Sequence, residues 1–461
     1  MKLLFIKPPK KHVTHLAPDL GLGYLSSYSK RAGHLVQVLD LNLHKDPDKK
    51  LKEKIEAFKP DFIGFKMFSE DFSSVSRLSA LIKRINPEII TMAGGPHPSI
   101  DPYATLKKIN TLDFLFKGEA EIGLVELLKN LESSDLSKIP SLVWRNKKDE
   151  VVVNQQLFFE PLDELGMPEW SLIDPRNYPD SGGVYSKSFP TAPIITSRGC
   201  PFNCAFCAVK VITGRKIRKR SPENVITEIK FLYDNYGVKC FNICDDNFTS
   251  DKNYTIDFCK KLIDTNLDVS WFCSQGVRLD SLDEETLSLM KKSGGYALGV
   301  GIESGSDRVL KLMNKHLDTK TVKEKIDLLN KFDFDITGFF ILGFPGETKK
   351  EIKQTIRFSR KLKLNKVGYN LFMPIPCTEA YDRIKKEGGT NSLRWDDYST
   401  DSVIYTPEGV SRSWLFFQQR LANFMFYIRP KILFPLLKEV SASKNVYNVF
   451  GRRIKRLLYT S

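Results

Sequence analysis

The sequence predicts an α/β protein with two successive sheets of parallel strands, joined by an irregular segment and followed by helices. Apolar strand-like runs alternate with amphipathic helical runs over residues 1–130, and the same alternation resumes at Pro193 and continues to Cys377. Polar or glycine-rich turns follow most strands of both sets. Parallel sheets place ligand sites beyond the carboxyl ends of their strands, so these turns hold the candidate site residues.

Length and composition fit an ordinary globular chain of two or three domains. The chain has 461 residues, of which 41% are hydrophobic and 27% charged, and no apolar run reaches about 18 residues. The apolar stretch after Met1 is too short for a signal peptide. Eight cysteines, three of them clustered, indicate a reducing compartment, and we expect the protein in the cytoplasm. The net charge of +15 suits acidic partners, although dispersed lysines are more typical of a solvated surface.

A doubly wound sheet is predicted over residues 1–135. Strands at residues 3–6, 35–39, 62–65, 89–93 and 114–116 alternate with helices at residues 21–32, 51–58, 74–85 and 121–131. The turns after three of these strands hold the candidate ligand contacts Pro8, Met67, Ser69, Gly94 and Gly95. The two glycines let the backbone approach a ligand closely, although a plain turn explains them equally well.

A connector is predicted over residues 136–190. Residues 142–145 and 151–154 flank a polar turn and favour a β-hairpin. Prolines at positions 161, 168, 175 and 179 then punctuate an irregular crossing segment. We recognise no catalytic pattern in it.

A partial (β/α)₆ barrel is predicted over residues 191–394. Its strands are expected at residues 192–196, 240–244, 270–274, 297–302, 336–342 and 368–373, and its helices at residues 222–236, 251–265, 283–293, 319–331 and 349–362. The strand ends deliver the candidate site residues Asp245, Asp246, Arg278, Glu303, Gly343 and Gly346. This is the edge at which barrels of this kind build their active sites.

A loop with three cysteines follows the first strand of this second set. Cys200, Cys204 and Cys207 have the spacing CxxxCxxC, and no further cysteine or histidine nearby in sequence completes a set of four. Three thiolates can ligate three irons of a cubic iron–sulfur cluster and leave the fourth iron open for a ligand. Zinc is the rival metal, although a tetrahedral zinc site wants a fourth ligand. Phe206 directly precedes the last cysteine, where an aromatic ring can pack over a cluster or beside its ligand.

The cysteine loop resembles the signature of radical S-adenosylmethionine (radical SAM) enzymes, in which an aromatic residue precedes the last cysteine. Residues 18–25 (PDLGLGYL), 94–98 (GGPHP) and 117–121 (KGEAE) resemble the cobalamin-binding domain that precedes many radical SAM cores. The chain is therefore similar to the class B methyltransferases, a group related to the anaerobic magnesium-protoporphyrin cyclases. The resemblance implies that residues 1–135 bind cobalamin and that residues 191–394 form the radical SAM barrel.

The resemblance also implies how cobalamin is held. Cobalamin domains of the methionine synthase kind carry a DxHxxG motif whose histidine ligates cobalt, and this motif is absent here. His44 follows Asp40 at the wrong spacing, and His97 suits a structural role or a contact with the cofactor tail. Base-off cobalamin without a histidine ligand is expected, with residues 67–71 near its lower face. A vestigial domain that has lost cobalamin is the alternative.

The strand ends of the second set match the polar groups of SAM. An ammonium group needs carboxylates or carbonyls, and a carboxylate needs Arg or backbone donors. Asp245 and Asp246 suit the ammonium group, and Arg278 suits the carboxylate. Glu303 suits the ribose or the ammonium group, and the turn at residues 343–346 lets the backbone approach adenine. A helix cap is an equally good role for one of the two aspartates, and a salt bridge is the alternative role of Arg278.

The resemblance implies the following reaction. A [4Fe-4S] cluster donates an electron to SAM, and the resulting 5′-deoxyadenosyl radical abstracts hydrogen from a carbon of a small-molecule substrate. Methylcobalamin then methylates that unactivated carbon, and an external donor similar to flavodoxin or ferredoxin supplies the electron. A cyclase or rearrangement enzyme of the same family is one alternative. A non-catalytic metal-knuckle protein that binds nucleic acid is the rival of another class, although we expect no nucleic-acid partner.

The last region, residues 395–461, is predicted to be helical. Residues 414–429 and 431–440 mix aromatic and aliphatic residues with bases, and we expect residues 414–429 to pack over the barrel mouth. The tail at residues 451–459 is basic and amphipathic, which permits peripheral contact with an anionic membrane. The basic run at residues 210–220 either balances the cluster, binds an acidic substrate or forms a solvated loop. Cys377 stands where the related pattern has glycine, as a neutral substitution or as a thiol facing substrate.

Overall fold

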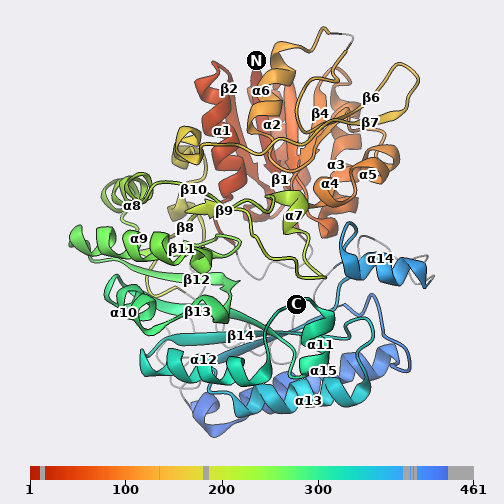
Figure 1. The fold of residues 1–461 in the computed structure, drawn as a ribbon. Coiled ribbons are helices and arrows are strands. Elements are labelled where there is room, and N and C mark those ends of the chain that lie inside the picture. The colour runs from red at the N-terminus through yellow and green to blue at the C-terminus, as the bar shows by residue number, and fades with distance from the viewer. Residues whose placement is uncertain are drawn as a thin grey trace.

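The structure, a computed structural model, describes residues 1–10, 16–133, 135–179, 186–387, 395, 398 and 402–434. Two sheets with their covering helices form the upper and lower parts of Figure 1, and the first part of the chain makes the upper one. The predicted α/β fold is confirmed, because parallel strands alternate with helices in both parts.

The first sheet has seven strands in the order β2-β1-β3-β4-β5-β6-β7, of which β1 to β5 pair in parallel. The predicted hairpin is present as β6 and β7, but it pairs with β5 and extends this sheet instead of standing in a separate connector. The strands are β1 (Lys2–Lys7), β2 (Leu35–Asp40), β3 (Phe62–Lys66), β4 (Ile90–Gly94), β5 (Phe114–Phe116), β6 (Leu142–Arg145) and β7 (Val151–Val153).

The helices of the first sheet are α1 (Leu20–Arg31), α2 (Pro47–Phe58), α3 (Phe72–Ile85), α4 (Pro96–Ile100), α5 (Pro102–Lys108) and α6 (Glu121–Lys129). The sequence pattern does not predict α4 and α5, which follow the glycine turn after β4. Pro96 and Pro102 begin these two helices, a position where proline fits because its missing N–H has no intrahelical partner to lose.

The second sheet has six parallel strands in the order β15-β14-β13-β12-β11-β8. Chain order equals spatial order, as expected when a helix returns the chain after each strand. The strands are β8 (Thr191–Ile194), β11 (Cys240–Ile243), β12 (Ser270–Val277), β13 (Gly295–Glu303), β14 (Asp335–Leu342) and β15 (Lys366–Leu371). The helices are α8 (Pro222–Tyr236), α9 (Lys252–Asp264), α10 (Glu284–Lys292), α11 (Asp307–Leu312), α12 (Thr319–Lys331), α13 (Lys349–Lys361), α14 (Glu379–Lys386) and α15 (Arg412–Tyr427).

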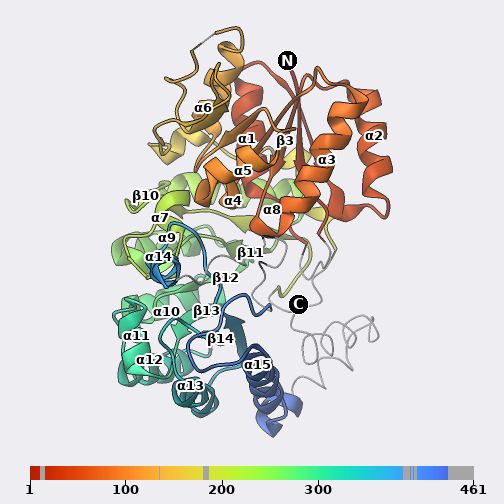
Figure 2. The same ribbon diagram turned by 90° about the vertical axis from the view of Figure 1, so that its right-hand side faces the viewer.

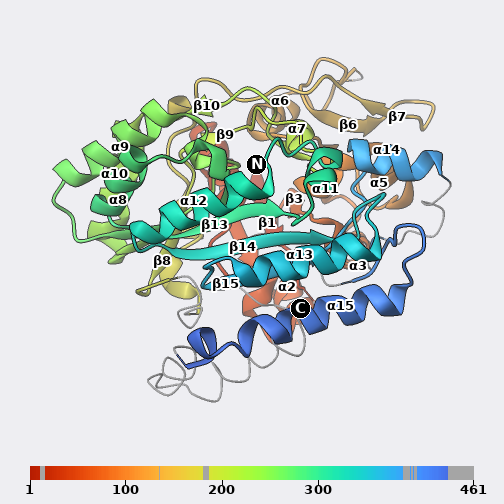
Figure 3. The same cartoon turned by 60° about the horizontal axis from the view of Figure 1, so that its bottom comes forward.

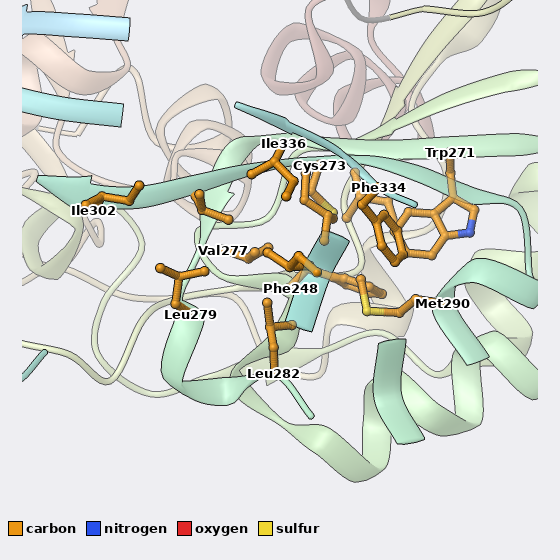
Figure 4. Packing of buried hydrophobic residues seen from close by; sticks show 14 of the residues in the cluster. Phe248, Trp271, Cys273, Val277, Leu279, Leu282, Met290, Ile302, Phe334 and Ile336 are labelled. Carbon is orange, nitrogen blue, oxygen red and sulfur yellow. The ribbon is translucent and has the colours of Figure 1, made fainter. Parts of the chain in front are cut away.

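Local sequence signals explain where these helices begin and end. The hydroxyl of Ser221, the predicted N-cap of α8, accepts a hydrogen bond from the backbone of Asn224. Gly237 ends the same helix in the left-handed conformation. Between helices and sheet lies an apolar core, in which Phe248, Trp271 and Met290 pack together with strand residues (Figure 4).

In Figure 1 the strands of the second sheet run across the direction of those of the first, and α7 (Val209–Ile212) and α14 lie between the two parts (Figures 1 and 2). Burial raises the pKa of Cys244 at the end of β11 to about 12, and the nearby ammonium of Lys66 at the end of β3 opposes this shift. Lys117 of the first part likewise lies close enough to influence the thiol of Cys377, beyond β15. The predicted ligand edges therefore face one another across one region.

Helix α15 packs against β15 and α13, and Leu415, Ala422 and Phe426 enter the main core. The segment packs as expected, but the predicted place over the barrel mouth is wrong, because the helix lies beside the edge strand β15 and α13. The basic tail at residues 451–459 lies outside the described residues, as does the greater part of the helix predicted at residues 431–440.

Candidate active site

The three predicted cluster ligands lie on a loop that is closed by a short ribbon. β9 (Ser197–Arg198) enters the loop and pairs with β10 (Arg218–Lys219), which leaves it. Gly199 has a φ of 96°, and a Cβ at this position would lie 2.2 Å from the carbonyl oxygen of Lys216. Only glycine permits this close approach of two backbone segments. The backbone N–H of Cys200 then donates to the carbonyl of Gly214 at 3.1 Å, which fixes the start of the loop.

Cys200, Cys204 and Cys207 are partly exposed free thiols. Burial raises the pKa of all three thiols, that of Cys207 to about 12. Within the described part of the chain, no three His, Cys, Asp or Glu side chains are arranged to hold a single metal ion. A cubic cluster does not require such convergence, because each thiolate ligates a different iron.

Asp245 and Asp246, which follow β11, accept hydrogen bonds from the residues that lead into this loop. Asp245 is buried and accepts hydrogen bonds from the backbone and hydroxyl of Thr196 and from the hydroxyl of Ser197. Asp246 accepts a hydrogen bond from the backbone N–H of Gly199 at 2.9 Å. Burial raises the pKa of Asp245 to about 6, and the hydrogen bonds from Thr196 and Ser197 oppose that shift. Both aspartates are thus engaged by the chain itself, and their predicted contact with SAM stays a prediction.

Arg278 lies beside the cysteine loop at the end of β12. Its guanidinium stacks on the ring of Phe202, within the loop, with 3.8 Å between the guanidinium carbon and the ring centroid. Its Nε and Nη2 donate to Asp280, and Nη2 also donates to the carbonyl of Lys315 at 2.7 Å. The remaining nitrogen, Nη1, is buried and has no hydrogen-bond partner among the described residues. A buried donor without a partner is costly, so this atom marks a place for a ligand acceptor.

Glu303 ends β13 with a φ of 66°, in the left-handed region that side-chain-bearing residues rarely adopt. Its Oε1 accepts from the ammonium of Lys315 at 2.8 Å, and both side chains are buried. Lys315 is a site residue that the sequence analysis missed. Burial raises the pKa of Cys204, whereas the cations Lys315 and Arg278 oppose this shift, which places both cations close to that thiol.

The turn after β14 combines two glycines with a buried carboxyl group. Gly343 and Gly346 have φ values of 83° and 80°, and the backbone N–H groups of Gly343 and Phe344 donate to Oε2 of Glu347. Burial raises the pKa of Glu347 to about 8. A Cβ on Gly343 would meet the side chain of Leu415 at 2.6 Å, so packing against α15 requires this glycine. The predicted approach of this turn to adenine stays a prediction.

Phe206 packs with Ala205 of the cysteine loop and with Phe344 of this turn in a small apolar cluster. The cluster also includes Phe372, beyond β15, which meets Phe344 edge-on with 5.2 Å between ring centroids. This packing joins the cysteine loop, which follows the edge strand β8, to residues beyond β14 and β15 at the other edge of the second sheet. This packing does not test the prediction that Phe206 lies over an iron–sulfur cluster or beside the ligand of that iron–sulfur cluster.

The carboxyl edge of the first sheet combines backbone and neutral groups with two ion pairs, Lys66 with Asp19 at 2.9 Å and Lys7 with Asp40 at 3.2 Å. Met67 is buried in the core, so only its backbone can face a ligand, whereas the adjacent Phe68 is exposed. Gly95 has a φ of 106°, and a Cβ there would lie 3.2 Å from the carbonyl oxygen of Met67. Ser69 bonds Nδ1 of His97 at 3.0 Å. Pro8 is buried at the end of β1, and Gly94 ends β4.

His97 is fully buried and faces the rings of Phe72 and Trp395. Burial lowers the pKa of His97 to about 4, so the imidazole is neutral near pH 7. Its Nε2 has no hydrogen-bond partner among the described residues. The predicted structural role of His97 agrees with this packing.

A buried ion-pair network joins the first sheet to the cysteine loop. Glu119 accepts two hydrogen bonds from Arg218, at 2.8 and 2.7 Å, and lies 3.4 Å from Arg198. Glu121 accepts from Arg198 at 2.9 Å. These contacts connect both strands of the ribbon, β9 and β10, to residues 117–121, which follow β5 of the first sheet. Arg218, and also Arg220 which pairs with buried Glu228, therefore do not belong to a solvated loop.

The fold and the cysteine loop define a radical SAM enzyme with a second cofactor domain before the barrel. The family model of the radical SAM superfamily matches residues 194–359, and that of the B12 binding domain matches residues 7–128. An uncharacterized methyltransferase of Pyrococcus horikoshii is 30% identical over 99% of this chain and 97% of that protein. The chain belongs to the cobalamin-dependent radical SAM enzymes, as the motifs predict, and the non-catalytic nucleic-acid-binding alternative is not supported.

Two further proteins resemble this chain. The anaerobic magnesium-protoporphyrin IX monomethyl ester cyclase of Rubrivivax gelatinosus is 24% identical over 96% of this chain and 80% of that protein. The radical SAM methyltransferase TsrM of Kitasatospora setae, solved with cobalamin and a [4Fe-4S] cluster bound, has a TM-score of 0.72 at 18% identity. The match covers 90% of this chain and 80% of TsrM, and it shows a common fold.

Proposed function

We propose that this enzyme transfers a methyl group to an unactivated carbon of a small molecule. The observation that carries the proposal is the buried, unpartnered Nη1 of Arg278 beside the cysteine loop, which fits the carboxylate of SAM. Arg–carboxylate bonds are charge-assisted and therefore strong. When bound, the cluster, SAM and cobalamin supply the one-electron cleavage of SAM and the methyl group.

The residues of the second sheet hold and orient the charged cofactor. Cys200, Cys204 and Cys207 ligate three irons, and Asp245 and Asp246 fix the loop that carries them. Beside these ligands, Lys315 and Arg278 contribute positive charge that stabilises the anionic cluster and its thiolates. Phe202 keeps the guanidinium of Arg278 in place by stacking.

The carboxyl edge of the first sheet receives cobalamin. Pro8, Ser69 and the Gly94–Gly95 turn present backbone and small groups there, and exposed Phe68 provides an apolar surface. His97 is neutral, but its ring is buried and held by Ser69. We infer that it does not ligate cobalt, so that cobalamin binds in the base-off form.

The electron comes from outside this chain. We infer a flavodoxin- or ferredoxin-like donor and a reducing compartment such as the cytoplasm. All eight cysteines are free thiols, which agrees with a reducing compartment.

Anaerobic reconstitution with iron and sulfide tests the proposal. We expect a brown cluster that, after reduction with SAM, yields 5′-deoxyadenosine. Cys204→Ala should abolish both, whereas Cys377→Ala, at a cysteine outside the loop, should retain both. No cluster, or a cluster indifferent to SAM, would refute the proposal.

A second measurement separates methyl transfer from the cyclase chemistry of the Rubrivivax gelatinosus relative. The proposed methyl transfer consumes two SAM molecules: one gives its methyl group and becomes S-adenosylhomocysteine, and the other is reductively cleaved to methionine and 5′-deoxyadenosine. Formation of both, with a methylated product, supports the proposal. 5′-Deoxyadenosine alone, with loss of hydrogen from the substrate, favours a cyclase.

A further inference from the structure

Helices α13 and α15 form an outer face of the second part of the molecule. They lie side by side at its lower edge in Figure 1, and Figure 3 shows α15 outside α13. At their first turns, the ammonium groups of Lys349 and Lys353 lie 5.6 and 5.9 Å from the ring centroid of Trp414. At their last turns, Arg429 donates to the carbonyl of Arg360 at 3.0 Å. The two helices therefore run in the same direction along their whole length.

The outer side of α15 is apolar although its inner side already fills the core. Phe417 and Phe424 are 59% and 53% exposed, and Phe416 and Ile428 are also exposed. Residues 417, 424 and 428 are spaced by seven and four, so they form one stripe along the helix. Exposed aromatic residues in a continuous stripe mark an interaction surface, whereas single ones do not.

The two helices that form this face are rich in basic residues and nearly free of acidic ones. Six basic residues of α13 are exposed, namely Lys349, Lys350, Lys353, Arg357, Arg360 and Lys361. The single acid of that helix, Glu351, is buried and paired with Arg308. Residues 409–434 contain no Asp or Glu and add Arg412, Arg420, Arg429 and Lys431.

We propose that the outer face of α13 and α15 docks on an anionic membrane surface. A helix that lies in the lipid interface needs aromatic residues on one side and Lys or Arg beside them, as here. Each Lys or Arg near an anionic surface contributes about 1 kcal/mol of attraction. A nucleic acid would contact the basic residues of α13 but not the apolar stripe of α15, because proteins bind the nucleic-acid backbone through its phosphates.

No helix of the described residues is apolar over enough turns to cross a bilayer. The proposed contact is therefore peripheral, and it is independent of the tail at residues 451–459. It would leave the opposite side of the second sheet, with the cysteine loop and the first sheet, directed away from the lipid (Figure 1).

Co-sedimentation of the reconstituted full-length chain with vesicles tests this proposal. Vesicles of phosphatidylglycerol should bind the protein at least about tenfold more tightly than vesicles of phosphatidylcholine, and about 0.5 M salt should weaken the binding. Phe417→Ser/Phe424→Ser and Lys350→Glu/Arg357→Glu should each weaken binding roughly tenfold or more. Each variant should keep its cluster colour and its unfolding midpoint, which shows that it folds.

Matched variants on other faces provide the control. Leu35→Ser/Tyr103→Ser removes two exposed apolar side chains of the first part, and Lys52→Glu/Lys320→Glu reverses two charges elsewhere. Both should bind the vesicles like the unaltered chain. The proposal is overturned if anionic vesicles are not bound. It is also overturned if the two variants of α13 and α15 bind as tightly as the two control variants, which is the result expected if residues 451–459 alone attach to the membrane. It is also overturned if the aromatic substitutions instead dissociate a dimer, or if only a DNA duplex is bound.

Discussion

The carboxyl edges of the two sheets face each other but expose different chemistry. The second edge holds buried charges, namely Arg278 beside the cysteine loop and the pair of Lys315 and Glu303. At the first edge, Ser69 bonds His97, the strand-end charges are paired as Lys66 with Asp19 and Lys7 with Asp40, and backbone turns and exposed Phe68 remain. The difference agrees with the proposal that the second edge binds the charged end of SAM through an unpartnered charged donor, Nη1 of Arg278. At the first edge the charges already have partners, so the proposal assigns more of the cofactor contact there to shape and apolar surface.

Removing the charge at the second edge should have the largest effect on cofactor binding. Arg278→Met should weaken SAM binding about 10- to 100-fold, because a hydrogen bond to a charged group contributes about 1.5–3 kcal/mol. Equilibrium binding of SAM to the reconstituted enzyme measures this loss. The exposed Arg176, paired with Asp174, provides the control, and Arg176→Met should bind SAM normally. Unchanged SAM affinity of Arg278→Met would show that the unpartnered nitrogen has another role.

Breaking the ion-pair network that joins the first sheet to the cysteine loop should have the largest effect on the stability of the fold. Glu119→Gln leaves Arg218 and Arg198 buried with too little negative charge, and such a loss costs about 3–5 kcal/mol. We expect a lower midpoint of thermal unfolding and a cluster that is lost faster on dilution. The exposed Glu160, which pairs with Lys216, is the matched position, and Glu160→Gln should change neither quantity. Equal behaviour of the two variants would contradict a role of Glu119 in holding the ribbon.

The sequence predicts the two sheets and the cysteine loop because both depend on local patterns. Strand and helix periodicity is visible in each segment, and Cys200, Cys204 and Cys207 lie within eight positions. Lys315 was missed because it lies twelve residues beyond its partner Glu303, on a loop without a motif. The pairs of Glu119 with Arg198 and Arg218 join segments far apart in sequence, so the basic run from Lys210 resembles a solvated loop until the tertiary contacts are known.

Helices α4 and α5 show the same limit at the level of secondary structure. Their sequences are short and rich in proline, and the glycines before them indicate a turn. The backbone N–H of His97 in α4 donates to the carbonyl of Met67 on the neighbouring strand end. This tertiary hydrogen bond fixes α4 at the ligand edge. The five residues of α4 are too few to show a helical periodicity in the sequence, so the helix could not be predicted from it.

The neutral carboxyl group at the second edge should affect stability only over part of the pH range. The pKa of Glu347 is about 8 in the folded chain and ordinary in the unfolded one. Between about pH 4.5 and pH 8, folding therefore takes up a proton, and stability falls as the pH rises through this window. Glu347→Gln should remove up to about 5 kcal/mol of this pH dependence, since one pKa unit corresponds to about 1.4 kcal/mol. Thermal unfolding of both chains at several pH values measures the difference, and parallel curves would contradict the buried proton.

The smallest effect is expected at the first edge, where the comparison predicts no change in cobalt ligation. His97→Asn keeps a polar group near Nδ1 for Ser69 but removes the ring nitrogen Nε2, the other atom that could ligate cobalt. Because His97 is buried and its Nδ1 is already bonded to Ser69, the variant should bind cobalamin with the same base-off absorption spectrum. A spectrum that is histidine-ligated in the unaltered chain and base-off in the variant would reverse the conclusion. The first edge would then bind its cofactor through a specific ligand, as the second edge does, and not through shape alone.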